Sequence, residues 1–256
     1  MNLLEIRNLS KRYADFRAVN DVSFDVREGE LLALIGPNGA GKTTTFNMIN
    51  GQLEPSSGSI AFMGTRIERW APRRIARLGV SRTFQIAETF ASMRVVENVQ
   101  MALLACHRKT FSFLRGAAAQ YRQQAMDLLA QVGMADQASR PCSELAYGDV
   151  KRVELAMALA NEPRLLLMDE PTAGMAPRER NELMALTRQL VMRRKLGVLF
   201  TEHSMDVVFS YSDRVIVLAR GELVAEGDVA TIRQHAGVRE VYFGGTPEPG
   251  PLATRG

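Results

Sequence analysis

Residues 31–43 read Leu-Leu-Ala-Leu-Ile-Gly-Pro-Asn-Gly-Ala-Gly-Lys-Thr, so an apolar run passes directly into a glycine-rich loop. The loop fits the pattern G-x-x-x-x-G-K-[ST] and consists of Gly36, Pro37, Asn38, Gly39, Ala40, Gly41, Lys42 and Thr43. In this pattern a buried strand precedes the loop and a helix follows it, here predicted over Thr44–Ile49. Backbone N–H groups of such a loop turn toward a phosphate, and the helix N-terminus adds partial positive charge. The stretch therefore predicts a nucleotide site in which Lys42 reaches the β and γ phosphates and the Thr43 hydroxyl binds Mg²⁺.

The composition is that of an ordinary soluble protein, with 256 residues, of which 46% are hydrophobic and 23% are charged. The net charge of +4 is too small to indicate nucleic-acid binding by itself. Cys106 and Cys142 are the only cysteines, too few for a disulfide framework. Apolar stretches have six residues or fewer, against the roughly 20 that span a bilayer, and the N-terminus has the pattern of a strand rather than a secretory signal. We therefore expect a protein of the reducing cytosol that crosses no membrane unaided.

The periodicity of the chain indicates an α/β core with an insertion. Alternating segments at Leu3–Leu9 and Val22–Val26 predict an antiparallel hairpin or edge sheet. Apolar runs predict buried parallel strands at Leu31–Ile35, Leu165–Met168, Val198–Thr201 and Val215–Leu218. Between residues 86 and 160 only helical spacing occurs, at Val95–Leu104, Ala118–Val132 and Val150–Ala160. The tail after Tyr242 is rich in glycine and proline, and we expect it to be disordered.

A cluster of arginines lies between the first buried strand and the helical insertion. It comprises Arg66, Arg69, Arg73, Arg74, Arg77 and Arg82. Ile67, Ile75 and Leu78 occur among them at helical spacing around Pro72. This pattern is typical of a short helix with a solvated basic face, and we interpret the whole cluster in that way.

An acidic pair follows the apolar run at Leu165–Met168. In a P-loop enzyme a carboxylate at the end of a neighbouring buried strand helps to hold the metal. We expect Asp169 to hold Mg²⁺ through water, and Glu170 to orient and deprotonate the water that attacks the γ-phosphorus. The alternative is a structural pair, which is costly to bury unless a cation compensates the charge.

Further segments resemble the ATP-binding subunits of ABC transporters. Leu145-Ala146-Tyr147-Gly148-Asp149 stands where that family has its L-S-G-G-Q signature. Gln85 matches the Q-loop, His203 matches the switch histidine, and Ala173-Gly174-Met175-Ala176 stands at the place of the D-loop. Tyr13 stands where an aromatic residue stacks on adenine, although it could equally pack on the hairpin. These landmarks follow the family order and cover about residues 3–243.

The resemblance implies an α/β P-loop NTPase core of the ABC ATPase type with an N-terminal antiparallel β subdomain, over residues 1–85 and 161–243. It also implies an inserted α-helical subdomain over 86–160 that ends in the signature helix, and a disordered tail over 244–256. The implied cofactors are ATP and Mg²⁺, with Thr43, Gln85 and Asp169 at the metal. The implied catalytic residues are Lys42, Gln85, Glu170 and His203. The implied nucleotide-binding residues are Tyr13, Gly36, Pro37, Asn38, Gly39, Ala40, Gly41, Lys42, Thr43, Thr44, Ala146 and Gly148.

The resemblance also implies partners. These are a second ATP-binding subunit, identical or homologous, in a head-to-tail dimer, and two membrane-spanning permease subunits, with a substrate-binding protein acting indirectly and no nucleic acid. The chain would then lie peripherally on the cytoplasmic face of the inner (plasma) membrane. A groove beside Gln85 would accept a permease helix. Phe90, Met93, Val95 and Val96 either line that groove or belong to the core of the helical lobe.

The signature departs from the common form at three positions: Ala146 replaces serine, Tyr147 replaces glycine and Asp149 replaces glutamine. The lost hydroxyl removes a phosphate donor and Asp149 adds negative charge, so a chain that binds ATP and hydrolyses it weakly is an alternative. The Leu-Ala-Tyr-Gly form and the segment Glu202-His203-Ser204-Met205 are similar to ATP-binding subunits of branched-chain amino-acid importers, and related subunits serve urea or lipopolysaccharide. The rival class is a soluble ABC ATPase acting on nucleic acid or ribosomes. Such proteins generally carry two cassettes or a long coiled coil, whereas this chain has one P-loop and no sustained heptads.

Overall fold

The computed structural model describes residues 1–83, 89–106 and 121–238 of the chain. Within them, an antiparallel four-stranded sheet has the order β2-β1-β4-β5, and a six-stranded sheet has the order β10-β9-β3-β8-β7-β6. The first sheet is formed by β1 (Asn2–Tyr13), β2 (Phe16–Arg27), β4 (Ser57–Phe62) and β5 (Thr65–Arg66). The second is formed by β3 (Leu31–Ile35), β6 (Val80–Thr83), β7 (Leu165–Asp169), β8 (Gly197–Thr201), β9 (Arg214–Ala219) and β10 (Glu222–Gly227). Strands β6, β7, β8, β3 and β9 are parallel, and β10 is antiparallel to β9.

Strand β3 lies at the centre of the molecule and is buried on both faces. Leu31, Ala33 and Ile35 belong to one apolar cluster, which continues into the helices. Leu32 and Leu34 belong to a second cluster, which lies against the antiparallel sheet. Successive strand residues point to opposite faces, so a strand between two cores needs an unbroken apolar run rather than an alternating one. This requirement explains the five consecutive apolar residues that precede the glycine-rich loop.

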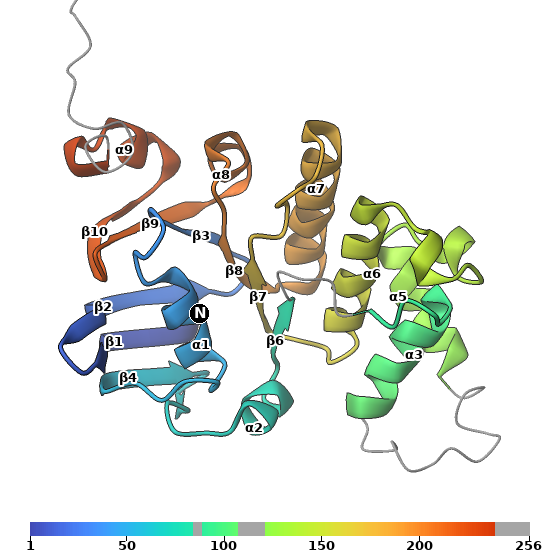
Figure 1. The fold of residues 1–256 in the computed structure, drawn as a ribbon, viewed down its shortest axis with the longest axis horizontal. Helices are drawn as coiled ribbons and strands as arrows, with labels where there is room; N and C mark the ends of the chain where they lie inside the picture. The colour runs from blue at the N-terminus through green and yellow to red at the C-terminus, as the bar shows by residue number, and fades with distance from the viewer. Residues whose placement is uncertain (84–88, 107–120, 239–256) are drawn as a thin grey trace, which may run out of the picture.

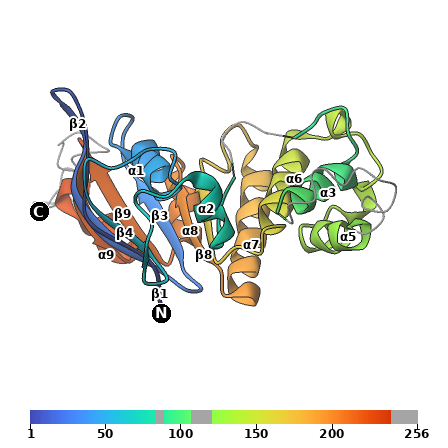
Figure 2. The ribbon, with the colours of Figure 1, turned by 90° about the horizontal axis from the view of Figure 1, so that it is seen from below.

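The helices form two groups, one packed around the sheets and one set apart. The first group contains α1 (Lys42–Ile49), α2 (Pro72–Arg77), α7 (Pro177–Arg194), α8 (Met205–Tyr211) and α9 (Val229–Gln234). The second contains α3 (Val95–Cys106), α5 (Arg122–Gln131) and α6 (Tyr147–Leu159), with short 3-10 helices at Ala135–Gln137 and Cys142–Glu144. Figures 1 and 2 both show α7 standing between the sheets and the second group, which we call the helical lobe. The α/β core with an antiparallel sheet and a helical insertion is therefore confirmed.

Several element boundaries differ from those predicted. The hairpin strands are longer than expected, reaching Tyr13 and starting at Phe16, because partly polar residues continue the ladder beyond the apolar segments. Helix α1 begins at Lys42 rather than Thr44, and α6 begins at Tyr147 rather than Val150. A first helical turn that consists of polar residues or glycine has no apolar periodicity, so the sequence pattern places the start of the helix too late. The predicted helix over Ala118–Val132 lies partly outside the described residues, and its described part is α5.

The arginine cluster is solvated along α2, as expected, but Arg82 is an exception. Arg73, Arg74 and Arg77 are exposed on α2, and Ile75 is buried beneath them. Arg82 instead lies on β6, and its side chain is only 12% exposed. The interpretation of Arg82 as part of a solvated face was therefore wrong. The sequence pattern grouped Arg82 with the helix, whereas Arg82 lies on strand β6 and forms a buried ion pair with Asp169.

Candidate active site

The glycine-rich loop connects the end of β3 to the start of α1 and has the shape that a phosphate site requires. Gly41 precedes α1 with φ at 100°, a conformation that favours glycine, and a Cβ built there would lie 2.6 Å from the carbonyl oxygen of Ala18. A Cβ on Gly36 would lie 2.2 Å from the carbonyl oxygen of Leu218. Glycine is therefore needed at both ends of the loop. Between them, Pro37, Asn38 and Gly39 are exposed and Ala40 is buried, while Thr43 is exposed and Thr44 is half-buried at the start of α1.

Lys42 lies in the first turn of α1 and folds back over the loop. Its Nζ donates to the carbonyl oxygens of Gly36 at 2.7 Å and Pro37 at 3.2 Å. Burial lowers the pKa of this ammonium from its ordinary value, and the negative charges of Glu170 and Asp169 partly oppose that shift. The same electrostatic contacts place Lys42 near the acidic pair. Lys42 is thus positioned to exchange carbonyl acceptors for phosphate oxygens without moving into a new environment.

Three strand ends bring the predicted catalytic residues to one edge of the sheet. The order β3-β8-β7 is parallel, so the loop after β3, His203 after β8 and the acidic pair at the end of β7 meet at the carboxyl edge. Asp169 is buried, and its Oδ1 accepts from the Thr201 hydroxyl at 2.8 Å. Its Oδ2 accepts from Arg82 at 2.7 Å. Both carboxylate oxygens of Asp169 are therefore held in place.

Glu170 has an uncommon backbone conformation and a direct contact with His203. Its φ is 48°, in the left-handed region that non-glycine residues seldom adopt, and its N–H donates to the Thr201 hydroxyl at 3.0 Å. The Glu170 Oε1 and His203 Nε2 are 2.8 Å apart. The sequence placed both residues near the γ-phosphate but did not predict that they contact each other. This pair lies at the exposed side of the site, where the His203 side chain is 49% exposed.

Glu202 is a buried residue for which the sequence pattern predicted no role. Its Oε1 accepts from the backbone N–H and the hydroxyl of Thr172, at 3.0 Å and 2.5 Å. Its Oε2 accepts from the backbone N–H of His203 at 3.1 Å. One carboxylate therefore links the segment after the acidic pair to the segment that carries His203. The sequence signal that could have found Glu202 is its place directly before the candidate switch histidine, at the end of an apolar strand.

The signature segment forms the start of α6. Ala146 is the N-cap residue and supplies no side-chain acceptor, Tyr147 is 44% exposed and Gly148 is buried. A Cβ on Gly148 would lie 3.4 Å from the Glu179 carboxylate and from the Met175 side chain, so this end of the helix packs against α7 and the segment before it. Asp149 lies in the first turn. The uncapped N–H groups of this first turn are the type of donor that binds anions.

Tyr13 and Gln85 complete the predicted set. Tyr13 lies at the end of β1, opposite Phe16 in the hairpin, and both rings are exposed, at 48% and 63%. The Lys11 Nζ lies 5.3 Å from the centre of the Tyr13 ring. An exposed ring is available for stacking, as the adenine role requires. Gln85 lies outside the described residues.

The site fits Mg²⁺ bound together with a nucleotide. The protein oxygens that this edge offers are the exposed Thr43 hydroxyl and the carboxylate of Asp169. Mg²⁺ in phosphate-transfer sites takes one or two protein ligands and completes its shell with phosphates and water. The donor set therefore suits a metal that is held largely by the nucleotide.

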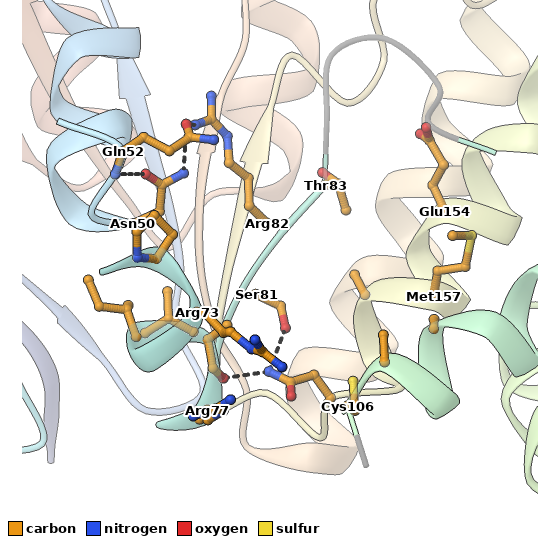
Figure 3. A pocket seen from close by; sticks show the side chains of 18 residues that line it. Asn50, Gln52, Arg73, Arg77, Ser81, Arg82, Thr83, Cys106, Glu154 and Met157 are labelled. Carbon is orange, nitrogen blue, oxygen red and sulfur yellow. Dashed lines mark hydrogen bonds between the residues drawn. The ribbon is translucent and has the colours of Figure 1, made fainter. Parts of the chain in front are cut away.

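A groove separates the core from the helical lobe. The cavity has a volume of about 420 Å³, with α2 and β6 on one side and α3 and α6 on the other (Figure 3). Its walls include Arg73, Arg77, Arg82, Ala105 and Met157. Val95 and Val96 are instead buried in the core of the lobe, at 0% and 1% exposed, and the described lining includes neither these two nor Phe90 and Met93.

The parallel sheet, the glycine-rich loop and the acidic pair define a P-loop nucleotide-binding ATPase. The protein-family model described as "ABC transporter" matches residues 19–173. The "High-affinity branched-chain amino acid transport ATP-binding protein LivG" of Salmonella typhimurium is 38% identical over 250 residues, covering 94% of this chain and 98% of that protein. The corresponding protein BraF of Pseudomonas aeruginosa is 38% identical over 252 residues, covering 94% and 98%. A solved nucleotide-free ATP-binding cassette from an ABC transporter has a TM-score of 0.85 at 28% identity, covering 94% of this chain and 99% of that one. The chain therefore belongs to the ABC transporter family and is an ABC ATPase.

Proposed function

We propose that this chain is the ATP-hydrolysing subunit of an importer for branched-chain amino acids. The observation that carries the proposal is the 38% identity to LivG, which extends over 94% of this chain and 98% of that protein. A match over 94% of this chain includes the helical lobe as well as the core. The substrate itself would contact other subunits, so it is inferred from the relatives rather than from the site.

We propose the following division of roles at the sheet edge. The loop over residues 36–43 and Thr44 bind the phosphates through backbone N–H groups and through the Lys42 ammonium, and Tyr13 stacks on the base. Thr43, Asp169 and Gln85 hold Mg²⁺, which neutralises charge on the phosphates when it is bound. Glu170 orients and deprotonates the attacking water, and His203 releases its contact with Glu170 to donate to the γ-phosphate.

A second ATP-binding subunit completes the site in this proposal. In a head-to-tail dimer the start of α6, with Ala146 and Gly148, would face the nucleotide held by the partner, where uncapped N–H groups stabilise the γ-phosphate. Asp149 brings a negative charge to the same turn. We therefore expect the dimer to close on ATP less tightly than it would with glutamine at that position.

Two permease subunits would contact the groove between α2, β6, α3 and α6, so that ATP hydrolysis changes their conformation. A substrate-binding protein would deliver the solute to these permeases. The groove is lined by apolar side chains, such as Ile75 and Met157, and by the arginines Arg73, Arg77 and Arg82, a combination that suits an amphipathic helix. No helix in the described part of the chain has both the length and the apolar character to cross a bilayer. Contact with the permeases, in this proposal, places the chain peripherally at the cytoplasmic face of the inner membrane.

The test is capture of the tagged chain from gently solubilised membranes of its native cell, with mass spectrometry of the proteins that co-purify. We expect two multi-span permeases and an ATP-binding subunit. Ala105→Glu puts a charge on an exposed residue of the groove and should abolish permease capture while the purified chain keeps its ATPase activity. Met192→Glu is the matched control, because Met192 is 68% exposed on α7 and does not line the groove. Capture of ribosomal proteins without any permease would contradict the transport role.

A further inference from the structure

Arg82 is the side chain in direct ionic contact with the carboxylate assigned to Mg²⁺. It lies on β6 beside β7, and the guanidinium reaches Asp169 Oδ2 at 2.7 Å. The same group donates to Asn47 Oδ1 at 2.7 Å and to Gln52 Oε1 at 3.0 Å. Figure 3 shows Arg82 extending toward Gln52, above the groove. Arg82 therefore joins the metal carboxylate to α1 and to the turn after it.

The contact is buried, which makes its charge balance important. The side chains of Arg82 and Asp169 are 12% and 5% exposed. A buried carboxylate without a counter-charge is strongly destabilising, and removing one partner of a buried pair leaves that cost uncompensated. Lys42 is nearby, but its ammonium donates to the loop carbonyls of Gly36 and Pro37. Lys42 and Arg82 both act on Asp169 electrostatically, and the guanidinium of Arg82 is the group in direct hydrogen-bonded contact with its carboxylate.

We propose that Arg82 is the resident counter-ion of Asp169 and keeps Mg²⁺ out of this site until a nucleotide arrives. This inference rests on the proposed role of Asp169 in holding the metal. A divalent cation that approaches alone meets a carboxylate that is already paired and a positive charge beside it. Nucleotide phosphates bring the negative charge that offsets this repulsion, so metal and nucleotide enter together. Arg82 is in this view a positioning residue, because it acts through Asp169.

The role also fits how Asp169 is oriented. Thr201 holds Oδ1 and Arg82 holds Oδ2, so the carboxylate is fixed on two sides before any ligand binds. Each carboxylate oxygen accepts more than one hydrogen bond, so a metal-bound water can still donate to it. The guanidinium therefore lowers the affinity of the site for Mg²⁺ alone. When the nucleotide is bound, the Asp169 carboxylate can still accept hydrogen bonds from metal-bound water.

The experiment is a titration of the nucleotide-free protein with Mg²⁺ alone, followed by thermal unfolding, because a ligand that binds the native state raises Tm with its concentration. We expect the wild type to show little shift. Arg82→Met removes the charge while keeping an unbranched side chain, and we expect it to bind Mg²⁺ alone at least about tenfold more tightly, since the unpaired carboxylate lacks a counter-charge. Arg82→Lys retains the charge and should behave like the wild type. The double variant Arg82→Met, Asp169→Asn should lose the effect.

The controls separate this inference from general damage and from the proposed function. Arg164→Met breaks the ion pair with Glu28, away from the site, and should leave the response to Mg²⁺ unchanged. Arg82→Gln serves if Arg82→Met does not fold, because its amide can still bond Asn47 or Asp169. Folded variants at Arg82 that bind Mg²⁺ alone no more tightly than the wild type would overturn the inference. Failure of the wild type to bind ATP, measured separately with a fluorescent nucleotide, would instead overturn the proposed function.

Discussion

Glu170 and Lys42 each have an energetically unfavourable feature. For Glu170 it is the backbone conformation, and for Lys42 it is a buried charge. Glu170 has a φ of 48°, which costs about 1–3 kcal/mol for a non-glycine residue, and its N–H bond to Thr201 and contact with His203 hold it there. Lys42 carries its charge in a buried position, 7% exposed, and its acceptors among the described residues are the carbonyl oxygens of Gly36 and Pro37. Both features agree with the ligand-binding and catalytic roles that we propose for these residues.

Replacing Lys42 by methionine should reduce ATP affinity by about 10- to 100-fold, because a charge-assisted contact with phosphate is lost. The stability of the nucleotide-free protein should change little near neutral pH, since the variant also removes a buried charge. Fluorescent-nucleotide titration measures the first quantity and urea unfolding the second. Lys195→Met, which removes an exposed ammonium, is the control and should leave ATP affinity unchanged.

The same variant has a pH signature with a defined sign. The pKa of Lys42 in the folded protein lies below its ordinary value of 10.5, because burial disfavours the ammonium. As the pH rises from the folded pKa toward 10.5, the unfolded chain holds this proton and the native state does not, so stability increases. The unfolding free energy of the wild type relative to Lys42→Met should therefore increase with pH across this window. A relative stability that falls over the same range would contradict the assignment.

Among the elements, the loop between β3 and α1 depends on glycine for two separate reasons. Gly39 and Gly41 both have positive φ, at 78° and 100°. No heavy atom lies within 4 Å of a Cβ built on Gly39, whereas one on Gly41 would lie 2.6 Å from the Ala18 carbonyl oxygen. Glycine is therefore needed at position 39 only for its backbone conformation. At position 41 it is also needed because β2 lies too close to the loop for a side chain.

This difference predicts unequal costs of alanine at the two positions. Gly39→Ala should destabilise the nucleotide-free protein by about 1–2 kcal/mol, the penalty of a left-handed conformation. Gly41→Ala should cost at least about 2 kcal/mol more, because the backbone of β2 or the loop must move. Urea unfolding of the two variants under the same conditions measures the difference. Equal costs would show that the close approach to Ala18 does not constrain the loop.

Helix α6 shows how one element can serve stability and function in opposite ways. Its N-cap residue, Ala146, has no side chain that can accept from the first turn, whereas serine would. Asp149 in that turn interacts favourably with the positive end of the helix dipole. In the proposed dimer, the charge that stabilises the isolated chain would therefore oppose the γ-phosphate of the nucleotide held by the partner.

On the scale of the whole molecule, the sheets and the helical lobe lie on opposite sides of α7, and the groove runs between core and lobe (Figures 1 and 3). The start of α6 belongs to the lobe, whereas the glycine-rich loop and the acidic pair belong to the core. In the proposed dimer, closure on ATP therefore joins the lobe of one chain to the core of the other. The charge of Asp149 is expected to act at this step.

Asp149→Gln should increase the affinity of ATP-dependent dimerisation and decrease the folding stability of the monomer. We expect monomer stability to fall by about 0.5 kcal/mol, because the favourable charge at the helix end is lost. In a Glu170→Gln background, which should retain ATP by slowing hydrolysis, Asp149→Gln should increase the dimer fraction measured by size-exclusion chromatography with ATP. Asp127→Asn in the same background is the control, because Asp127 is an exposed carboxylate on α5 rather than in the first turn of α6. A smaller dimer fraction in the Asp149 variant would show that this carboxylate supports the dimer.

The local parts of this protein were predictable from the sequence. The apolar run of β3, the glycine-rich loop and the acidic pair at the end of β7 each consist of consecutive residues, and the unbroken apolar runs that define the central sheet are equally local. Element ends were less predictable, as at Lys42 and Tyr147, because a first helical turn has little apolar periodicity.

Contacts between distant residues depended on the tertiary structure. Arg82 was grouped with the solvated arginines because its partner Asp169 lies 87 positions away, and spacing along a helix carries no information about that partner. The contact between Glu170 and His203 joins residues 33 positions apart at the ends of different strands. Sequence alone therefore determined which chemical groups reach the carboxyl edge of the sheet, since each follows its own strand. Which of these groups pair there, and which cation balances Asp169, was set by the order of the strands, because only their parallel packing brings the side chains within bonding distance.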